Sequence, residues 1–592
     1  MTITEKYNNW LAQPKLDGVL KEQLEAMNEA DIEDAFYTEL EFGTAGMRGI
    51  MGPGTNRMNI YTIRKANVGF AKYLLENETD AKTKGVAIAY DSRHQSYAFA
   101  LESAVVLGTY GIKTYVFESP RPTPELSFAV RNLGCVGGIV ITASHNPPAY
   151  NGYKIYDASG SQVLPDATEL VIAGVNAVKD VFEIEVLSAQ ELQTSGLIEM
   201  IGEAVDTAYI EAVKTIQLNP QVEKSDLSIV FTPLHGTAGD LVNRLLVETG
   251  YTNVSFVKEQ TQPDGDFPTV TYPNPEEPAA FTMAEALGKE VGADILLATD
   301  PDADRMGVAV AITDTNYSLN NQTFTMSENL TPNEKKDYLL LSGNQTGALM
   351  VYYILTQKKE KGTLPTKGRV FDTIVSSALG RMIAQSFGMT VTSTLTGFKF
   401  IGEQARLMED TDETYVFGYE ESYGSLVSDF VRDKDALQAV LLLSEAAAYY
   451  KTQGKTLNDV LHEIYKIYGY YEEALENISL TGKSGSEKIK TLLATFRSAP
   501  PVEVAGVKVV KIYDYLTQRQ RENGGETVID LPTSDVLKYV LADGSWFVIR
   551  PSGTEPKAKI YIGAVTDCLS QTSQRVLAIK ADVLALVNQI LK

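Results

Sequence analysis

Three aspartates at alternate positions follow an apolar strand in the segment ATDPDADRMGV. A loop that curls after the strand aims Asp300, Asp302 and Asp304 at one point, and carboxylates that converge in this way need a cation. An EF-hand would have glycine at its sixth position and glutamate at its twelfth, where this chain has Arg305 and Ala311. The pattern therefore favours a hard ion such as Mg²⁺ over Ca²⁺ sensing, and the alternative is a solvated acidic turn.

A serine and a histidine stand where another apolar strand ends, in VITASHNPPAY. Thr142 and Asn146 occupy the places that glycines take in a nucleophile elbow, so Ser144 is not a nucleophile of that type. Neighbouring side chains on an extended backbone point apart, which argues against a direct pair between Ser144 and His145. The two prolines that follow fix the backbone of the turn.

The segment RPSGTEPK follows the apolar strand WFVI and has the composition of a phosphate cradle. Arg550 offers a bidentate fork, Ser552 and Thr554 offer hydroxyls, and Gly553 lets backbone N–H groups come close. A nucleotide is not indicated, because the fragments GKT at 454 and GKS at 482 lack the first glycine of a P-loop. The alternative is an ordinary turn with a surface arginine.

Paired carboxylates lie between glycines in FGYEESYG. Glu420 and Glu421, next to Ser422, have the chemistry of a general acid and base. They could equally accept hydrogen bonds from sugar hydroxyls, and a solvent-facing turn is the remaining alternative.

The net charge of −24, from 52 basic and 76 acidic residues, restricts the partners of the chain. Nucleic acid needs a basic face and is therefore not an expected partner. An anionic substrate would be repelled by the overall field, so its site must supply local cations. The candidate cations lie in turn segments, several of them glycine-rich, and are Arg48, Lys154, Lys399 and Lys434.

Strands and helices alternate through most of the chain, which indicates an α/β fold. A helical extension and a glycine-rich loop at 41–59 come first, and a smaller α+β segment with a closing helix at 572–591 comes last. Between them we expect strands at 85–89, 113–117, 138–142, 227–231 and 295–298, and helices at 61–75, 98–107, 206–216, 240–249, 436–452 and 457–468. Because 592 residues exceed a single core, we expect roughly three to five domains.

Two strand ends repeat each other in sequence. IVITASHN (139–146) and IVFTPLHG (229–236) align without a gap, each with a threonine, two further residues, a histidine and a small turn residue. We interpret the repeat as a duplicated α/β unit, and the alternative is the chance similarity of buried strands.

The two cysteines, Cys135 and Cys568, lie in different regions, so neither a disulfide framework nor a structural zinc site is expected. The first residues, MTITEKYNNW, have no signal pattern, and no apolar run approaches the length that spans a bilayer. We expect a cytoplasmic protein with no membrane partner.

Four segments, TASHNP, DPDADR, GYEES and RPSGTEP, occur in this order between Phe42 and about Lys557. With them the chain resembles the α-D-phosphohexomutase family of phosphoglucomutases and phosphomannomutases. The resemblance implies four domains around a central cleft, of which three are similar mixed α/β domains and the fourth is a smaller C-terminal α+β domain. We place these domains at 1–205, 206–325, 326–468 and 469–592.

The resemblance also implies catalytic roles. Ser144 resembles the serine that carries a phosphoryl group in the family. Lys154 is then the candidate general acid or base, Arg48 lies against the transferring group, and His145 supports the loop. The ligands implied for Mg²⁺ are an oxygen of phospho-Ser144, Asp300, Asp302 and Asp304.

Substrate-binding roles follow from the same resemblance. Glu420 and Ser422 are expected to hold sugar hydroxyls, with Thr396 and Lys434 alongside, and Arg305 lies beside the metal loop. The phosphate that is not reacting is expected to be gripped by Arg550, Ser552, Gly553 and Thr554.

The implied reaction interconverts glucose 1-phosphate and glucose 6-phosphate. Phosphoserine donates to one sugar hydroxyl, glucose 1,6-bisphosphate forms and turns over, and the other phosphate returns to the serine. The sequence ESYG resembles the ESFG of glucose-specific relatives rather than the Ser-Gly-His pattern of mannose-using ones.

Alternatives stay open at this point. The chain length and the insert at 313–335 resemble a branch that also holds phosphopentomutases, so a phosphopentomutase or a phosphomannomutase with the same mechanism is possible. A Mg²⁺-dependent sugar phosphatase or bisphosphate synthase is an alternative of a different class, whereas a non-catalytic sensor would not need both Ser144 and the aspartates. We expect sugar phosphates as partners, glucose 1,6-bisphosphate as activator, and a monomer or weak oligomer.

Overall fold

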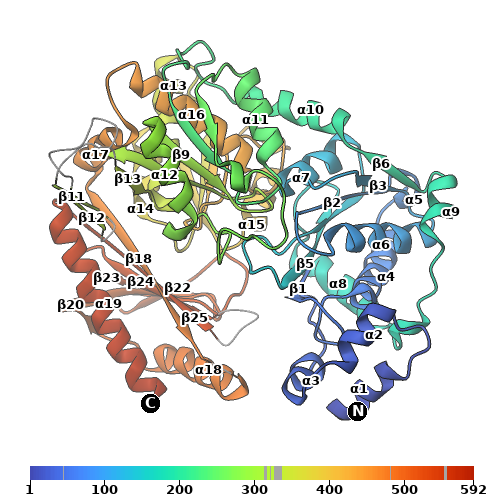
Figure 1. Cartoon of the computed structure of the whole chain (residues 1–592). Coiled ribbons are helices and arrows are strands. Elements are labelled where there is room, and N and C mark those ends of the chain that lie inside the picture. The colour runs from blue at the N-terminus through green and yellow to red at the C-terminus, as the bar shows by residue number, and fades with distance from the viewer. Residues whose placement is uncertain (44–45, 313–315, 320–321, 326–336, 481, 552–556) are drawn as a thin grey trace. The chain divides into compact units, whose positions relative to one another are not determined.

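The computed structural model describes residues 1–43, 46–312, 316–319, 322–325, 337–480, 482–551 and 557–592. The chain forms two compact units, whose helices and strands are labelled in Figure 1. The first unit comprises Met1–Val310, Leu340–Gly343 and Phe398–Gln453, and the second comprises Ala311–Leu339, Asn344–Gly397 and Gly454–Lys592. Most of the predicted site residues therefore belong to the first unit.

A six-stranded sheet in the first unit has the strand order β1-β5-β4-β2-β3-β6. Strands β2, β3, β4 and β6 are parallel, while β5 runs antiparallel to both β4 and β1. Parallel strands are buried on both faces, which explains the apolar runs VAIAY and GGIVI. The strands are β1 Gly46–Ile50, β2 Val86–Tyr90, β3 Thr114–Phe117, β4 Gly137–Ile141, β5 Tyr150–Asp157 and β6 Ile198–Ile201.

Helices cover both faces of this sheet. Because side chains alternate along a strand, Val86 and Ile88 of β2 face one side and Ala87 and Ala89 the other. The first pair lies in a core with α4, α6 and α8, and the second lies in a core with α7. The helices of this part are α4 Ile60–Asn77, α5 Ala81–Lys84, α6 Ser96–Thr109, α7 Thr123–Asn132, α8 Pro165–Asn176 and α9 Ala189–Thr194.

A second sheet of the first unit contains β10, β9, β7 and β8 in this order. Strands β7, β8 and β9 are parallel, and β10 is antiparallel to β9 with Met306 opposite Thr299. The aspartate segment is therefore the connection that turns the chain back between two buried strands. The elements are β7 Ile229–Thr232, β8 Val254–Phe256, β9 Ile295–Thr299, β10 Met306–Ile312, α10 Glu203–Lys214, α11 Gly239–Glu248 and α12 Thr282–Val291.

The last part of the first unit carries the EESYG turn. Strands β16 (Thr414–Tyr419) and β17 (Ser425–Leu426) are antiparallel, and the turn connects them. Helix α15 (Lys399–Leu407) precedes these strands and the buried helix α16 (Ala436–Lys451) follows them.

The second unit begins with a short hairpin and an α/β segment. The hairpin strands β11 (Asn316–Leu319) and β12 (Gln322–Thr325) belong to the insert at 313–335, whose other residues lie outside the described ranges. Strands β14 and β15 are parallel. The elements that follow the hairpin are β13 Asp337–Leu340, α13 Gly343–Glu360, β14 Gly368–Thr373, α14 Ala378–Ser386, β15 Thr390–Thr394 and α17 Leu457–Tyr468.

The smaller C-terminal α+β region predicted from the sequence is present in the second unit. Its antiparallel sheet has the order β18-β25-β24-β23-β20-β21-β22, with β19 paired to β20, and α18 and α19 share its core. The elements are β18 Tyr470–Ser479, α18 Gly482–Ser498, β19 Glu503–Val504, β20 Val507–Asp514, β21 Arg519–Glu522, β22 Gly525–Val528, β23 Leu537–Leu541, β24 Trp546–Pro551, β25 Lys557–Thr566 and α19 Leu569–Leu591.

The N-terminal extension is helical, as predicted. Helices α1 (Ile3–Leu11), α2 (Gly18–Glu25) and α3 (Glu29–Phe36) form an aromatic cluster with the body of the first unit. Trp10 packs edge-on against Phe36, Tyr61 and Phe182. Buried aromatic residues contribute most to such a contact, so the extension is held firmly.

The repeated strand ends share one backbone geometry. After β4, the N–H of Ser144 donates to Oγ1 of Thr142 at 2.8 Å, and after β7 the N–H of Leu234 donates to Oγ1 of Thr232 at 3.1 Å. The backbone φ angles of Ser144 and Leu234 are +50° and +46°. The sequence repeat therefore corresponds to the same local fold.

One prediction was wrong: part of the glycine-rich loop at 41–59 is a strand. β1 pairs with β5, and Gly46 stands opposite Lys154. A Cβ on Gly46 would lie 1.9 Å from the carbonyl oxygen of Tyr153, and its φ is +147°. Glycine is thus needed for the close approach of two strands rather than for a flexible loop.

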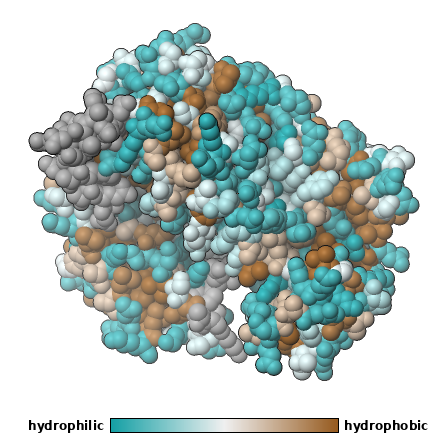
Figure 2. Space-filling model, in the orientation of Figure 1, coloured by the Kyte–Doolittle hydropathy of each residue, from teal (hydrophilic) through white to brown (hydrophobic). Residues whose placement is uncertain are grey.

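The outer surface has the polarity expected of the composition. Hydrophilic residues cover much of the face shown in Figure 2, with apolar residues in between. Among the described helices, none is both long and apolar enough to cross a membrane.

Candidate active site

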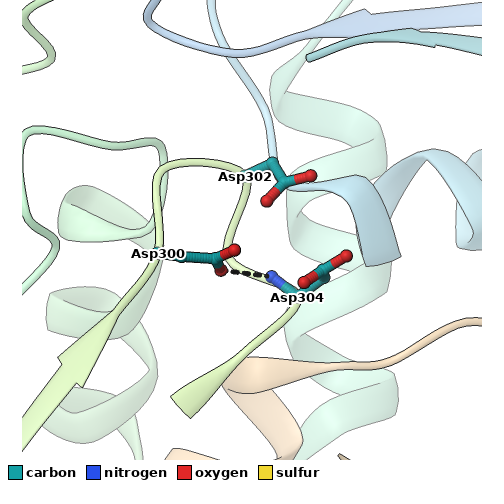
Figure 3. A group of neighbouring side chains, drawn as sticks. All are labelled: Asp300, Asp302 and Asp304. Atoms are coloured by element: carbon teal, nitrogen blue, oxygen red, sulfur yellow. Dashed lines mark hydrogen bonds between the residues drawn. The ribbon is translucent and has the colours of Figure 1, made fainter. Parts of the chain in front are cut away.

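The three aspartates converge in the connection between β9 and β10 (Figure 3). All three are buried, and one carboxylate oxygen from each lies within 4.8 Å of the others. Oδ1 of Asp300 accepts the backbone N–H groups of Asp304 at 3.2 Å and Arg305 at 3.0 Å. Between Asp302 and Asp304, the backbone of Ala303 has a φ of +52°. The loop thus curls back on its first carboxylate, as the spacing predicts.

The three aspartate carboxylates of this loop repel one another, and their pKa values are shifted. Burial raises the pKa of Asp300 well above its ordinary value, and the neighbouring Asp302 and Asp304 add to the rise. Burial, together with the charge of Asp302, also raises the pKa of Asp304. For Asp302, burial alone would raise the pKa, but the ammonium group of Lys154 helps to hold it below its ordinary value.

The aspartates fit a divalent cation. Oδ1 of Asp302 and Oδ1 of Asp304 are buried and have no hydrogen-bond partner among the described residues. Buried carboxylate oxygens that accept no hydrogen bond are costly, and a hard cation takes such oxygens as ligands. Within the part of the chain that the structure describes, these aspartates form the only group of three acidic, histidine or cysteine side chains with this geometry.

Ser144 points into the same loop. Its Oγ donates to Oδ2 of Asp300 at 2.7 Å, and the residue is 3% exposed. The prediction that Ser144 and His145 would not pair was wrong, because Oγ lies 3.3 Å from Nδ1 of His145. Ser144 is in the left-handed region instead of the extended one, so the rule that neighbouring side chains point apart does not apply.

Arg93, which the sequence analysis missed, holds the turn that carries Ser144. Its guanidinium donates to the carbonyl oxygens of Ser144 at 2.6 Å, Asn146 at 2.5 Å, Pro147 at 2.8 Å and Tyr150 at 3.1 Å. Its Nε lies 3.2 Å from the buried carboxylate of Asp91. The signal in the sequence was the charged segment DSR, which directly follows the buried strand β2.

Two of the predicted cations come from the β1–β5 pair. Arg48 on β1 donates to Oδ1 of Asn146 at 2.9 Å. Nζ of Lys154 on β5 donates to Oδ2 of Asp302 at 3.2 Å and lies 3.9 Å from Oδ2 of Asp304. The strand pairing thus brings a cation to the serine turn and another to the aspartates.

The EESYG turn reaches the aspartate loop from another side. The backbone of Arg305 forms an isolated β-bridge with that of Gly424. A guanidinium nitrogen of Arg305 lies 2.5 Å from a carboxylate oxygen of Glu276. Nζ of Lys434 lies 2.9 Å from Oδ2 of Asp304. A Cβ on Gly424 would lie 2.1 Å from Cδ of Lys434, so this glycine leaves room for the lysine stem. Glu420 is buried and Ser422 half-buried in the same turn.

The other predicted site residues belong to the second unit or lie outside the described residues. Thr396 follows β15 and Arg550 lies near the end of β24, and both belong to the second unit. Ser552, Gly553 and Thr554 lie outside the described residues. The group assembled in the first unit therefore comprises Arg48, Ser144, His145, Lys154, Asp300, Asp302, Asp304, Arg305, Glu420, Ser422 and Lys434.

This arrangement suits phosphoryl chemistry. A serine hydroxyl lies against the three aspartates, and arginine and lysine side chains lie beside both. Phosphoryl transfer depends largely on such positioning and charge neutralisation. The buried surroundings strengthen these electrostatic interactions, because water is excluded.

Family models match the chain along most of its length. They are described as phosphoglucomutase/phosphomannomutase alpha/beta/alpha domain I (residues 39–181), domain II (207–312) and domain III (342–468), and the C-terminal domain (495–573).

Full-length relatives are also found. The chain is 38% identical over 563 residues to a phosphoglucomutase of Staphylococcus aureus strain MRSA252, covering 95% of this chain and 96% of that one. It is 37% identical over 569 residues to a phosphoglucomutase of Staphylococcus haemolyticus, covering 96% and 98%.

Solved structures share the fold. A phosphoglucomutase/phosphomannomutase family protein from Burkholderia thailandensis matches with a TM-score of 0.65 at 18% identity, covering 93% of this chain and 97% of that one. The open form of parafusin, a phosphoglucomutase from Paramecium, matches with a TM-score of 0.66 at 18% identity, covering 94% and 95%.

Proposed function

The chain belongs to the phosphoglucomutase/phosphomannomutase family, and we propose that it interconverts glucose 1-phosphate and glucose 6-phosphate through a phosphorylated Ser144. The observation that carries the proposal is the contact of 2.7 Å between Oγ of Ser144 and Asp300, inside the group of buried aspartates. A serine that only stabilised a turn would not need an acidic cation site at its hydroxyl.

The aspartates provide the cofactor site. Asp300, Asp302 and Asp304 would hold Mg²⁺, which would withdraw negative charge from a phosphoryl group on the neighbouring serine. Arg48 and Lys154 add positive charge on the side of β1 and β5, and this compensates for the repulsion that an acidic protein exerts on an anionic substrate.

The chain's residues then divide the reaction between them. The bond between phosphorus and Oγ of Ser144 breaks while a bond from a sugar hydroxyl to phosphorus forms. Lys154, as a neutral amine at this step, accepts the hydroxyl proton and becomes the ammonium that adds positive charge to the site. The bisphosphorylated sugar turns over, and Oγ of Ser144 takes the other phosphoryl group as the proton returns to the released hydroxyl. His145, which lies against Oγ, supports the turn.

Substrate binding is assigned to the remaining predicted residues. Glu420 and Ser422 hold sugar hydroxyls, with Thr396, Arg305 and Lys434 alongside. Arg550, Ser552, Gly553 and Thr554 grip the phosphate that is not reacting. We further propose that the enzyme acts in the cytoplasm as a monomer or weak oligomer, with domains at 1–205, 206–325, 326–468 and 469–592.

A coupled assay tests the substrate. Wild-type protein is supplied with Mg²⁺, an activating bisphosphate and either glucose 1-phosphate, mannose 1-phosphate or ribose 1-phosphate. We expect the highest kcat/KM for glucose 1-phosphate, and a much higher value for ribose would overturn the glucose assignment. Release of inorganic phosphate in step with substrate loss would instead indicate a phosphatase.

A further inference from the structure

Three successive residues of a loop in the second sheet's domain contact the segment that holds the serine turn. The ring of Phe267 lies 4.9 Å from the guanidinium carbon of Arg93. Asp266 pairs with His94 at 2.7 Å, and a Cβ on Gly265 would lie 2.7 Å from the backbone nitrogen of His94. This loop, residues 264–267, is hereafter the bridge loop.

The bridge loop is also tied to the aspartate loop through the repeated turn after β7. The N–H of Asp264 donates to the carbonyl oxygen of His235 at 3.0 Å. Two residues further along that turn, the N–H and Oγ1 of Thr237 donate to the carbonyl oxygen of Pro301 at 2.9 and 3.0 Å. A continuous set of contacts therefore runs from Pro301, between Asp300 and Asp302, to Arg93.

The repeated turn does not carry the chemistry of its counterpart. Leu234 takes the position that Ser144 has after β4, and it is fully buried. Two residues further along, Gly236 packs so closely on Pro301 that a Cβ would lie 2.4 Å from Cα of Pro301. The turn therefore has a packing role against the aspartate loop, and it carries no hydroxyl of its own at that position.

Phe267 occupies an unusual position for a large residue. It is 1% exposed and has a φ of +47°, in the left-handed region. Bulky residues pay for this conformation in strain, and such strain persists where the surroundings fix it. Here the surroundings include the cation of Arg93 against the face of the ring, within the range of a cation–π interaction.

We propose that Arg93 and Phe267 are positioning residues for the proposed phosphoryl transfer, on which this inference rests. Arg93 fixes the Ser144 turn through its four carbonyl contacts. Phe267 fixes Arg93, and the bridge loop thereby keeps the serine turn in register with the aspartate loop. Neither residue contacts the reacting atoms.

The test compares three single variants by steady-state kinetics with glucose 1-phosphate. Phe267→Leu removes the ring face, and we expect kcat to fall about tenfold with KM within about twofold, because a small misplacement slows transfer without weakening binding. Phe267→Tyr keeps the ring and should retain most of kcat. Tyr251→Leu is the matched control, because Tyr251 is equally buried and the ammonium of Lys224 lies 5.3 Å from the centre of its ring. This variant should lower the apparent Tm and leave kcat unchanged.

Arg93→Lys tests whether Phe267 acts on the serine turn through Arg93. A lysine keeps the charge but cannot reproduce the planar fork, so we expect kcat to fall by about 100-fold. Because Phe267 acts through Arg93, the double variant should lose no more activity than Arg93→Lys alone. Intact mass measures the fraction of protein that the bisphosphate phosphorylates in a fixed short time. This fraction should be largest for wild-type protein, smaller for Phe267→Leu and smallest for Arg93→Lys.

The inference is overturned if Phe267→Leu and Tyr251→Leu have equal effects on kcat, or if the losses in the double variant multiply. These outcomes are distinct from failure of the proposed function. In that case wild-type protein itself would not convert glucose 1-phosphate.

Discussion

Residues in left-handed conformations occur in three of the loops that contribute to the site in the first unit. Ser144, Ala303 and Tyr423 have φ angles of +50°, +52° and +69°. Non-glycine residues are rarely found there, and the cost is accepted where a backbone turn must hold chemistry in place. In the serine turn, this conformation directs Oγ toward both Asp300 and His145, which an extended residue would not do.

Asp302→Asn keeps the shape of a proposed metal ligand and removes its charge. Oδ1 of Asp302 has no hydrogen-bond partner among the described residues, while Oδ2 accepts from Thr123 and Lys154. We expect kcat to fall by about 10²–10⁴-fold, partly recovered at high Mg²⁺, because one electrostatic stabiliser is weakened. Kinetics at several Mg²⁺ concentrations check this, with the exposed Asp240→Asn as control. An unchanged Mg²⁺ requirement would contradict the assignment.

The pKa of Lys399 predicts a loss of kcat/KM at high pH. Burial lowers the pKa of this lysine, at the start of α15, to about 8. If it is one of the cations that attract the substrate, its charge is lost as pH rises through 8, so kcat/KM should fall on that side. Lys399→Arg should remove the limb, because a guanidinium stays charged. The measurement is kcat/KM between pH 6 and 10 for both proteins, and the same limb in the variant would exclude Lys399.

At the scale of elements, the two antiparallel strands matter most for the site. β1 and β5 carry Arg48 and Lys154, and their register sets Gly46 opposite Lys154 and Arg48 opposite Gly152. The neighbouring backbone leaves no room for a side chain at the two glycines: a Cβ on Gly152 would lie 2.3 Å from the carbonyl oxygen of Thr142. The pair therefore lies close against the end of β4, where the serine turn begins.

This pair also explains where sequence reasoning succeeded and where it stopped. Buried parallel strands and amphipathic helices have strong patterns, and the helix expected at 61–75 is α4 at Ile60–Asn77. The polar, glycine-containing strands GMRGI and YNGYKIYD resemble loops, so neither was predicted as a strand. Spacing alone indicated the aspartates, because their ligand atoms come from one loop. Arg93 was missed because its four contacts are to backbone carbonyls that only the folded turn brings together.

A helix crossing offers a stability test at this scale. A Cβ on Gly69 in α4 would lie 2.5 Å from Cγ2 of Val175 in α8 and 2.7 Å from the carbonyl oxygen of Val171. Alanine normally stabilises a helix by about 0.5–1 kcal/mol over glycine, but overpacking costs about 1–3 kcal/mol. Gly69→Ala should therefore lower the apparent Tm in a thermal melt. Gly18→Ala, where nothing lies within 4 Å, is the control and should not lower it. A higher Tm for Gly69→Ala would show that the crossing can relax.

At the scale of the whole molecule, a strongly acidic chain is proposed to bind anionic sugars. The net charge is −24, yet the cations nearest the aspartates, Lys154 and Lys434, have side chains only 14% and 10% exposed. Charges in the site are thus separated from the surface field, which repels anions and is screened by salt.

Salt should therefore change substrate binding little. We expect KM for glucose 1-phosphate to vary by less than about threefold between low and 0.3 M NaCl at fixed Mg²⁺, because buried cations are poorly screened while surface repulsion is relieved. Initial rates over this range provide the measurement. A KM that rises tenfold or more would place the important cations on the open surface.

The most direct test of the central claim is the intact mass of the protein after incubation with glucose 1,6-bisphosphate and Mg²⁺. Wild-type protein should gain one phosphoryl group on Ser144, and glucose 1-phosphate should remove it. Ser144→Ala should gain none and should lose mutase activity by many orders of magnitude, while still binding sugar phosphate. If Ser144→Ala turned over glucose 1-phosphate at near the wild-type rate, or carried the phosphoryl group elsewhere, the phosphoserine mechanism would be wrong for this protein.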